Sequence, residues 1–307
     1  MKFLKLIRFQ NLLMIALMQC LFHFVFLKNQ TQFISLSNLQ YVLFVLATVC
    51  IAAAGYVIND IMDQEADAVN RPKTVIVNNG IKESTAYIIY IVLNVIGVGL
   101  GYYLSNIILK PSFLGFFIIT ALLLYLYATS LKGIPVIGNI VISLLLSLSV
   151  LMVGFFDLFP AMYEGNQTEI TYMFSILLDF AVFCFLINFL REVVKDLEDM
   201  KGDYNAGYSS LPIVLGQERT KKLLIAFTLV PIACLLYYIK TNFFELTYVL
   251  IYSLLFILAP LLLFVFKLWT ANKKGEFKNM GNLLKITLLF GILSIAVIQI
   301  NMYLNAK

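Results

Sequence analysis

Six aspartates in this sequence form two clusters with the same spacing. Both clusters follow the pattern D-x-x-D-x-x-x-D, and their members are Asp60, Asp63 and Asp67 in the first and Asp196, Asp199 and Asp203 in the second. On a helix, offsets of three and four residues place side chains on one face, a turn apart. Carboxylates stacked in this way repel each other. A single D-x-x-D is typical of a solvated acidic face, but two matching clusters indicate a site for cations.

Carboxylate oxygens in this number predict a magnesium site. Mg²⁺ keeps some of its waters, binds one or two carboxylates, and completes its coordination with substrate phosphates. Several such ions between the clusters would neutralise a diphosphate and make it a good leaving group. An allylic carbon–oxygen bond suits that chemistry because resonance stabilises the cation left behind. We therefore expect Mg²⁺ as the cofactor, all six aspartates as metal ligands, and Asn59 as a substrate-binding neighbour.

Basic and amide side chains near the clusters are candidates to bind the diphosphate itself. We expect four to pair with its oxygens, as arginine forks or lysine point charges: Arg71, Lys132, Arg191 and Lys195. Pairing with the aspartates is the alternative for each, and for Lys195, next to Asp196, the two interpretations are equally good. Asn11 and Asn139 are further candidates for substrate binding, although asparagine is common at membrane interfaces.

The elements that must position these residues are membrane helices. Of the 307 residues, 61% are hydrophobic and 13% are charged, which is too little charge to cover a soluble domain. Apolar runs of about 20 residues can cross a bilayer core. The sequence has nine, at residues 10–27, 39–58, 84–104, 112–130, 136–156, 170–190, 221–240, 246–266 and 283–303. We predict an all-α integral membrane protein, a bundle of nine transmembrane helices with two aspartate-rich cytoplasmic loops, forming a single domain over residues 1–307.

The distribution of positive charge predicts how the bundle is oriented. With a cytoplasmic N-terminus, only Lys28, Lys110, Lys240 and Lys307 face outward, which leaves 18 of the 22 Lys and Arg residues inside. This bias favours a multi-pass protein of the cell inner membrane whose clusters, after the second and sixth spans, face the cytoplasm. The net charge of +5 suits an anionic leaflet, and we expect no nucleic-acid partner.

Two polar stretches have open interpretations. The segment 196–220 is a candidate lid over the site, because Gly202, Gly207 and Gly216 would give it freedom to move. The segment 267–282 is basic with interleaved aromatic residues, so it is either an interfacial segment or a solvated connector.

Two features inside the apolar runs predict packing rather than chemistry. The small residues of the run from Gly97 to Gly101 are typical of close contacts between membrane helices. His23 is the only histidine and lies in an apolar run, so we expect a packed side chain and not a general base.

The clusters resemble the two signature motifs of the UbiA superfamily of intramembrane prenyltransferases. The first reads Asn59-Asp-x-x-Asp63-x-x-x-Asp67 followed by Asn70-Arg-Pro72, and the second spans residues 191–203. The nine predicted helices, and the position of the motifs after the second and sixth, also agree with that family. The resemblance covers essentially the whole chain.

Within the superfamily, the chain most resembles the digeranylgeranylglyceryl phosphate synthase branch. Residues 191–203 and 210–216 carry this likeness, and Tyr127 and Lys132 match a region where Tyr and Lys approach the diphosphate. The sequence departs from the family at Phe9, which replaces a proline. It also lacks a second Arg-Pro after Pro72, so that this basic contact is lost or moved to Lys73.

The resemblance implies a Mg²⁺-dependent transfer of a geranylgeranyl group from its diphosphate to geranylgeranylglyceryl phosphate, with formation of an ether. The residues expected to stabilise the leaving group are Tyr127, Lys132, Arg71, Arg191 and Lys195. The alternative with the same machinery is an aromatic prenyltransferase of quinone biosynthesis, acting on 4-hydroxybenzoate or a similar acceptor. A membrane transporter and a catalytically silent lipid-binding relative are alternatives of other classes. The expected partners are a prenyl diphosphate, a lipid or aromatic acceptor and membrane lipids; donor length and oligomeric state stay open.

Overall fold

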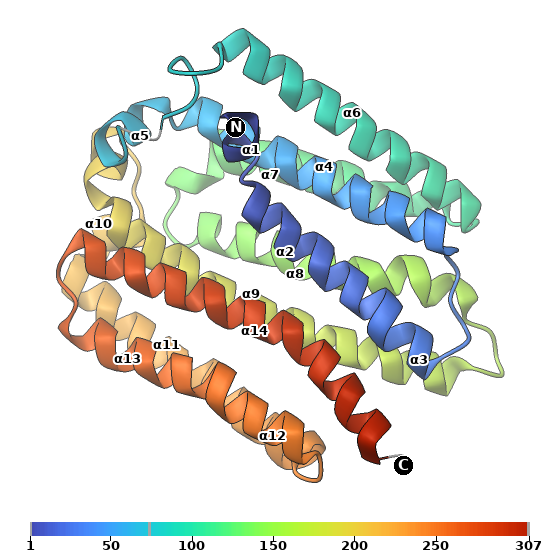
Figure 1. Cartoon of the computed structure of the whole chain (residues 1–307). Helices are drawn as coiled ribbons and strands as arrows, with labels where there is room; N and C mark the ends of the chain where they lie inside the picture. The colour runs from blue at the N-terminus through green and yellow to red at the C-terminus, as the bar shows by residue number, and fades with distance from the viewer. Residues whose placement is uncertain (1, 73–74, 306–307) are drawn as a thin grey trace.

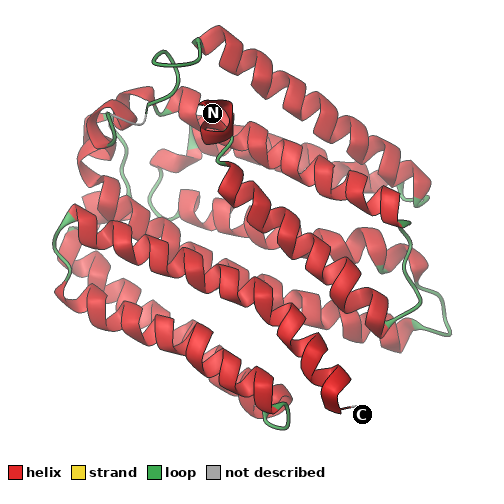
Figure 2. Cartoon of the chain, in the orientation of Figure 1, coloured by secondary structure: helices red, strands yellow, loops and turns green. Residues whose placement is uncertain are grey.

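The computed structural model describes residues 2–72 and 75–305, and within those ranges it is helical, without β-strands (Figure 2). Its α-helices are α1 (Lys2–Leu6), α2 (Phe9–Cys20), α3 (Lys28–Gln30), α4 (Asn38–Met62), α5 (Gln64–Asn70), α6 (Glu83–Ile107), α7 (Leu114–Thr129), α8 (Ile137–Asp157), α9 (Gln167–Asn205), α10 (Leu211–Leu215), α11 (Gln217–Tyr238), α12 (Thr247–Ser253), α13 (Ala259–Thr270) and α14 (Lys274–Asn305). Short 3₁₀ or π segments extend or join them: η1 (Leu21–Leu27), η2 (Pro111–Phe113), η3 (Leu131–Gly133), η4 (Phe159–Ala161), η5 (Ile239–Phe243) and η6 (Leu254–Leu258).

The nine predicted spans are confirmed. In the described part of the chain, nine continuous helical stretches are long and apolar enough to cross a membrane. Seven of them match the predicted runs to within a few residues at each end. The long helices lie roughly side by side, and α5 and α10 are gathered at one end of the bundle, at the left of Figure 1.

Two helices are much longer than their apolar runs. The sixth span, predicted over 170–190, is the 39-residue helix α9, which is about 58 Å long at ~1.5 Å per residue and exceeds a bilayer core of ~30 Å. The ninth, α14, begins at Lys274, so most of the predicted connector 267–282 is helical. A hydropathy run ends where charged residues begin, but a helix continues because its hydrogen bonds are internal to the backbone.

The prediction of two aspartate-rich loops is therefore wrong in its local structure. The second cluster lies on the last turns of α9, and the first lies on the end of α4, at Asp63 and on α5. The candidate lid is also mostly helix, since only residues 206–210 and Gly216 interrupt α9, α10 and α11. Carboxylates on rigid helices keep a fixed spacing, which a mobile loop would not provide.

The predicted glycine packing is confirmed. A Cβ at Gly97 would overlap Ile51 of α4, and one at Gly101 would overlap Phe117 of α7. The absence of side chains at both glycines lets α6 lie close to α4 and α7. These contacts hold the helix that carries the first aspartate cluster.

His23 is a packed residue, as expected. Its ring is fully buried, stacks on Tyr41 with centroids 3.7 Å apart, and forms a 2.5 Å hydrogen bond between Nδ1 and Oδ2 of Asp157. Asp157 also accepts a hydrogen bond from the backbone N–H of Leu36. Since Asp157 ends α8 and Asn139 lies in its first turn, this buried group is about 30 Å from the aspartate clusters.

Candidate active site

The first aspartate cluster lies where α4 gives way to α5. Asp63 occupies the break between these helices, with φ −88° and ψ 8°, and its side chain is buried. Asn59, one turn earlier, donates a hydrogen bond from Nδ2 to Asp63 Oδ2 over 2.6 Å. Asn59 thus holds the carboxylate of Asp63 in place and is itself buried at the site.

The second cluster lies on one face of the end of α9. Asp199 and Asp203 are buried, and Asp196 accepts a 2.9 Å hydrogen bond from Nδ2 of Asn139 at the start of α8. Arg71 donates to Asp199 Oδ2 over 2.6 Å and lies 3.7 Å from Glu198. Arg71 therefore reaches from the end of α5 to the opposite cluster.

A single amide side chain joins the two clusters. Asn70 donates to the backbone oxygen of Asp199 over 2.9 Å and accepts from the backbone N–H of Gly202 over 3.0 Å. A Cβ on Gly202 would overlap Asn70 and the backbone oxygen of Ala66. Glycine at this position lets α5 and α9 approach closely enough for the clusters to face each other.

Lys132 lies between the clusters. It comes from η3, between α7 and α8, and its ammonium contacts Oδ2 of Asp63. Burial by itself would lower the pKa of Lys132, but the Asp63 carboxylate, with a weaker contribution from Asp203, outweighs burial and raises it. Lys132 therefore stays protonated beside Asp63.

Residues of the connection after α9 complete this end of the site. The Tyr208 hydroxyl donates to Asp63 Oδ1 at 3.5 Å, and the Lys132 ammonium lies 5.7 Å from the centre of the Tyr208 ring. The backbone N–H of Ser209 bonds to the oxygen of Gly133 over 3.0 Å. This connection thus lies against the loop that carries Lys132.

Two predicted metal ligands have different surroundings from the others. Asp60 is paired with Arg8, at 2.9 Å between Nη2 and Oδ1, and Arg8 also lies over the Tyr56 ring at 5.0 Å. Asp67 is partly buried on α5. Asp60 therefore supports the N-terminal segment at the site, while Asp63, Asp199 and Asp203 are the buried carboxylates.

The remaining predicted residues line cavities next to the clusters. The α4–α8 cavity has Asn59, Tyr127, Lys195 and Arg191 at its polar end and continues along apolar residues such as Ile51, Phe117 and Met152. The α2–α14 cavity lies among α2, α9 and α14. Asn11, which donates to the Tyr56 hydroxyl over 3.2 Å, lines both cavities, as do Asn188 and Arg191.

The donor set fits Mg²⁺ held together with a phosphate-bearing substrate. Within residues 2–72 and 75–305, no group of three His, Cys, Asp or Glu side chains could hold a metal ion as the structure stands. Mg²⁺ needs only one or two carboxylates when phosphates and waters complete its shell. Asp199 Oδ1 is a suitable ligand atom because it is buried and accepts no hydrogen bond in the described part of the chain, with the Lys274 ammonium 3.9 Å away.

Sequence reasoning missed four residues that shape the site: Arg8, Asn70, Tyr208 and Lys274. Asn70 carried a signal, since it opens the Asn-Arg-Pro stretch after the first cluster. Gly202 lies between Asp199 and Asp203 and was assigned to a flexible lid, whereas the structure uses it for close helix contact. Lys73, the proposed replacement for a second basic contact, lies outside the described residues.

Sequence comparison places the chain among prenyltransferases. The model of the UbiA prenyltransferase family matches residues 16–297. The chain is 29% identical over 255 residues to the digeranylgeranylglyceryl phosphate synthase of Methanobrevibacter smithii, which covers 80% of this chain and 84% of that protein. It is 32% identical over 244 residues to the synthase of Korarchaeum cryptofilum, with coverage of 78% and 79%. The match to the Methanopyrus kandleri synthase, at 35% identity, spans 56% of either chain.

Solved structures show the same fold. An apo UbiA homologue from Aeropyrum pernix K1 superposes with a TM-score of 0.66 at 15% identity, over 96% of this chain and 98% of that one. A UbiA homologue from Archaeoglobus fulgidus bound to GPP and Mg²⁺ gives a TM-score of 0.60 at 17% identity, over 96% and 100%. At these identities the likeness concerns the fold of the bundle.

Proposed function

The chain belongs to the UbiA prenyltransferase family, and from that premise we propose that it transfers a geranylgeranyl group from geranylgeranyl diphosphate to geranylgeranylglyceryl phosphate, with Mg²⁺ as cofactor. The new bond joins the allylic carbon of the donor to the acceptor hydroxyl oxygen, whose proton is released, and diphosphate leaves. Relatives of this chain are named for that reaction, and its own polar end has the side chains that the reaction requires.

The observation that carries the proposal is the pair of facing aspartate clusters. Asp63 on one side and Asp199 and Asp203 on the other are buried, and Asn70 holds their helices together. Bound Mg²⁺ would neutralise the donor diphosphate and so favour departure of this group.

Several basic side chains would stabilise the same leaving group. Lys132 and Arg71 lie between or beside the clusters, and each has a raised pKa because nearby carboxylates outweigh the effect of burial. Both therefore stay cationic when the diphosphate separates from the allylic carbon. We assign Lys195 and Tyr127, at the polar end of the α4–α8 cavity, to contacts with the same end of the donor, while Arg191 lies where this cavity meets the α2–α14 cavity.

The α4–α8 cavity would hold the donor's prenyl chain. Its polar end begins at Asn59 beside Asp63, and its apolar part extends along α4, α7 and α8 to Met152. A chain in this cavity is shielded from water, which protects the allylic cation from hydrolysis. We also propose that this end of the bundle faces the cytoplasm, in accordance with the excess of Lys and Arg there.

The position of the carboxylates argues against a transporter. Ionisable residues of carriers commonly lie within the membrane along a transport path. Of the four aspartates buried in the described part of the chain, Asp63, Asp199 and Asp203 lie at the junction of α4 and α5 or at the end of α9, outside the predicted apolar runs. The fourth, Asp157, is hydrogen-bonded to His23 at the end of α8.

The test uses the purified protein in detergent with Mg²⁺ and geranylgeranyl diphosphate. Geranylgeranylglyceryl phosphate and 4-hydroxybenzoate are supplied separately, and diphosphate release and product mass are followed. We expect an ether-linked product with the lipid phosphate alone. A product with 4-hydroxybenzoate alone would show that the proposed acceptor is wrong and would support the proposed prenyl transfer. Failure to release diphosphate with either acceptor would contradict the proposal.

A pair of variants tests the metal site in the same assay. Asp63→Ala removes a buried carboxylate and should lower Mg²⁺-dependent turnover by about 100-fold or more. Glu65→Ala removes an exposed carboxylate of α5 and should change turnover by less than about twofold. Equal turnover of the two variants would show that Asp63 is not a metal ligand.

A further inference from the structure

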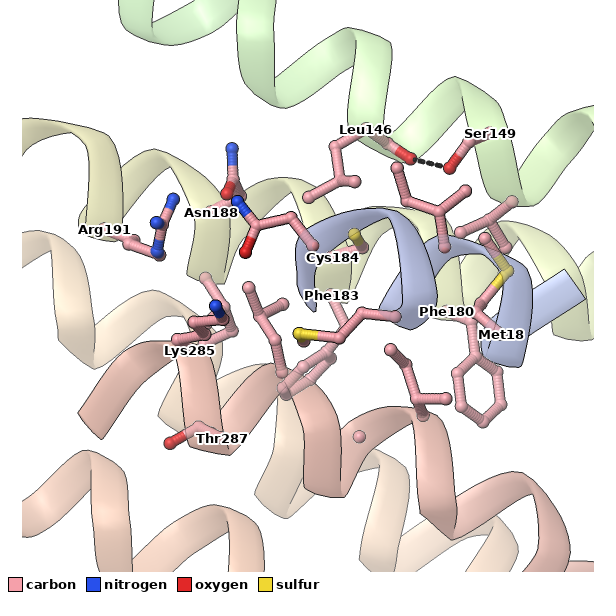
Figure 3. A pocket seen from close by; sticks show the side chains of 18 of the residues that line it. Met18, Leu146, Ser149, Phe180, Phe183, Cys184, Asn188, Arg191, Lys285 and Thr287 are labelled. Atoms are coloured by element: carbon pink, nitrogen blue, oxygen red, sulfur yellow. Dashed lines mark hydrogen bonds between the residues drawn. The ribbon is translucent and has the colours of Figure 1, made fainter. Parts of the chain in front are cut away.

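A second cavity meets the proposed donor cavity near the aspartate clusters. The α2–α14 cavity shares Asn11, Tyr56, Asn188 and Arg191 with the α4–α8 cavity and then diverges from it. Figure 3 shows Asn188, Arg191 and Lys285 gathered at one end of this cavity, with Met18 and Phe180 towards the other.

Lys285 is the feature that the proposed donor site does not explain. It lies on α14 between Leu284 and Ile286, is partly buried, and lines the α2–α14 cavity but not the α4–α8 cavity. In the ranges that the structure describes, its ammonium has no hydrogen-bond or ion-pair partner. A charged residue within a membrane helix is costly, and it usually serves a polar ligand or partner.

A second cation lies at the same end of the cavity. Arg191 of α9 pairs with Glu192 through Nη1 at 2.6 Å and lines the same cavity as Lys285. Both cations line this cavity and only Arg191 has a carboxylate partner, so they leave an excess positive charge at the end of an apolar cavity. Such an arrangement would bind an anionic head group whose hydrophobic chain extends towards Met18 and Phe180.

We propose that Lys285 and Arg191 bind the phosphate of the acceptor lipid, whose chain occupies the α2–α14 cavity. The inference rests on the proposed function, because it takes the acceptor to be a phosphate-bearing lipid. The reacting hydroxyl of geranylgeranylglyceryl phosphate is on the carbon next to the one that carries the phosphate. A phosphate at Lys285 and Arg191 therefore places that hydroxyl near Asn188, where the two cavities join. Lys285 is a specificity-determining residue in this scheme.

The experiment compares Lys285→Gln with Lys278→Gln, which removes an exposed lysine of the same helix outside the cavity. Binding of geranylgeranylglyceryl phosphate and of neutral geranylgeranylglycerol is measured by calorimetry without donor or Mg²⁺. Lys285→Gln should weaken binding of the phosphate lipid by about 10- to 100-fold, as expected for a lost charge-assisted contact. The affinity of Lys285→Gln for the neutral lipid should stay within about twofold of that of the parent protein. Lys278→Gln should change neither, and Lys285→Arg should restore most of the affinity.

A steady-state measurement separates this proposal from the proposed function. Lys285→Gln should raise KM for the phosphate lipid and leave KM for geranylgeranyl diphosphate unchanged. If the protein binds the phosphate lipid through Lys285 but forms no product from it, the head-group site stands and the proposed reaction fails. If product forms with an unchanged acceptor KM in Lys285→Gln, the reaction stands and the head-group site is wrong.

Two other sources of an anionic group are outcomes of the same experiment. Effective displacement of the phosphate lipid by phosphatidylglycerol would identify a general site for membrane lipids and overturn the proposal. Lys285-dependent binding of 4-hydroxybenzoate in place of the phosphate lipid would also overturn it. Loss of donor affinity in Lys285→Gln, as large as the loss of acceptor affinity, would assign Lys285 to the diphosphate instead.

Discussion

At the scale of single residues, we propose two functions for Lys132, both of which depend on its positive charge. Its ammonium contacts Asp63 and also interacts with Asp203, so it reduces the repulsion between the clusters in the structure described here. It lies where a donor diphosphate would be held between the same carboxylates. A lysine in this position can exchange a carboxylate partner for a phosphate oxygen without crossing the site, because its ammonium donates three hydrogen bonds.

We expect Lys132→Met to lower both activity and thermal stability. Loss of a cation near the leaving group should reduce kcat/KM by about 100-fold. Because the pKa of Lys132 is raised, its ion pair stabilises the fold fully at pH values below the ordinary lysine pKa of 10.5. This contribution is lost only as pH rises through the raised pKa. The fall in thermal midpoint caused by Lys132→Met should therefore be constant from about pH 7 to about pH 9.

Differential scanning fluorimetry of both proteins across this pH range checks the expectation. A difference in midpoint that shrinks steadily towards pH 9 would mean that Lys132 loses its proton there and would contradict the assignment. Lys82→Met, at the N-terminus of α6 and outside the site, is the control for loss of a lysine.

At the scale of helices, the contact between α5 and α9 determines how the two clusters face each other. α5 is a seven-residue helix that leaves the axis of α4 at Asp63, and α9 extends beyond its apolar run to meet it. Asn70 bonds to both Asp199 and Gly202 across this contact, and Arg71 adds the pair with Asp199. The distance between the clusters thus depends on how closely the backbone of α9 approaches α5.

We expect Gly202→Ala to disturb this contact. The added Cβ would overlap Asn70 and the backbone of Ala66, so α5 must move away from α9. Overpacking of this kind costs about 1–3 kcal/mol. The variant should lose thermal stability and should need more Mg²⁺ for half-maximal turnover. Gly99→Ala is the matched control, because a Cβ there has no neighbour within 4 Å and alanine favours a helix by about 0.5–1 kcal/mol.

The midpoint and the Mg²⁺ dependence are measured for both glycine variants. An unchanged Mg²⁺ requirement in Gly202→Ala would show that the spacing of α5 and α9 does not control the metal site. A loss of stability in Gly99→Ala equal to that in Gly202→Ala would show that any added methyl group harms this bundle.

At the scale of the whole molecule, the two ends of the bundle have different tasks. The end with α5 and α10 (Figure 1) collects the carboxylates of the two clusters and their cations, while the other end holds the buried group of His23, Tyr41 and Asp157. Asp157 ties α8 to η1 through His23 and to the segment before α4 through the N–H of Leu36. A substitution in this second group can therefore change the stability of the bundle without altering any residue of the site.

We expect Asp157→Ala to destabilise the protein and to leave donor binding intact. Removal of the Asp157 side chain leaves the buried ring of His23 and the N–H of Leu36 without their hydrogen-bond partner, which costs about 1–3 kcal/mol for each group. The thermal midpoint should fall, while KM for the donor below that midpoint should stay within about twofold of the parent. Glu164→Gln, in the exposed turn before α9, is the control and should alter neither. A changed donor KM without loss of stability would refute this separation of tasks.

Metal removal should affect activity and not the fold. The site carboxylates already have protein partners, namely Lys132 for Asp63 and Arg71 for Asp199, so the bundle does not require Mg²⁺ to offset their repulsion. EDTA should abolish turnover and leave the thermal midpoint within about 1 °C, since a ligand stabilises the folded state only when it is bound. Mg²⁺ with donor should raise the midpoint as donor concentration rises. A fall in midpoint with EDTA alone would show that the ion is part of the folded structure.

The amino-acid sequence by itself determined the features of this protein that depend on neighbours along the chain. The nine helices follow from apolar runs that match the thickness of a bilayer, and the shared face of each cluster follows from helical periodicity. The family could be identified for the same reason, since its motifs are contiguous segments. The apolar runs did not predict where α9 ends and where α14 begins. Hydropathy falls where charged residues begin, whereas the helix continues through them.

The tertiary structure alone decided which distant residues meet. Lys132 reaches Asp63 across 69 positions of the chain, Arg71 reaches Asp199 across 128, and Asn70 reaches Gly202 across 132. Lys285 likewise comes to lie beside Arg191 only because α14 packs on α9. Spacing along one helix places residues on a face but does not determine which face of another helix lies opposite. That choice depends on packing details such as the missing Cβ of Gly202, which act through the whole bundle.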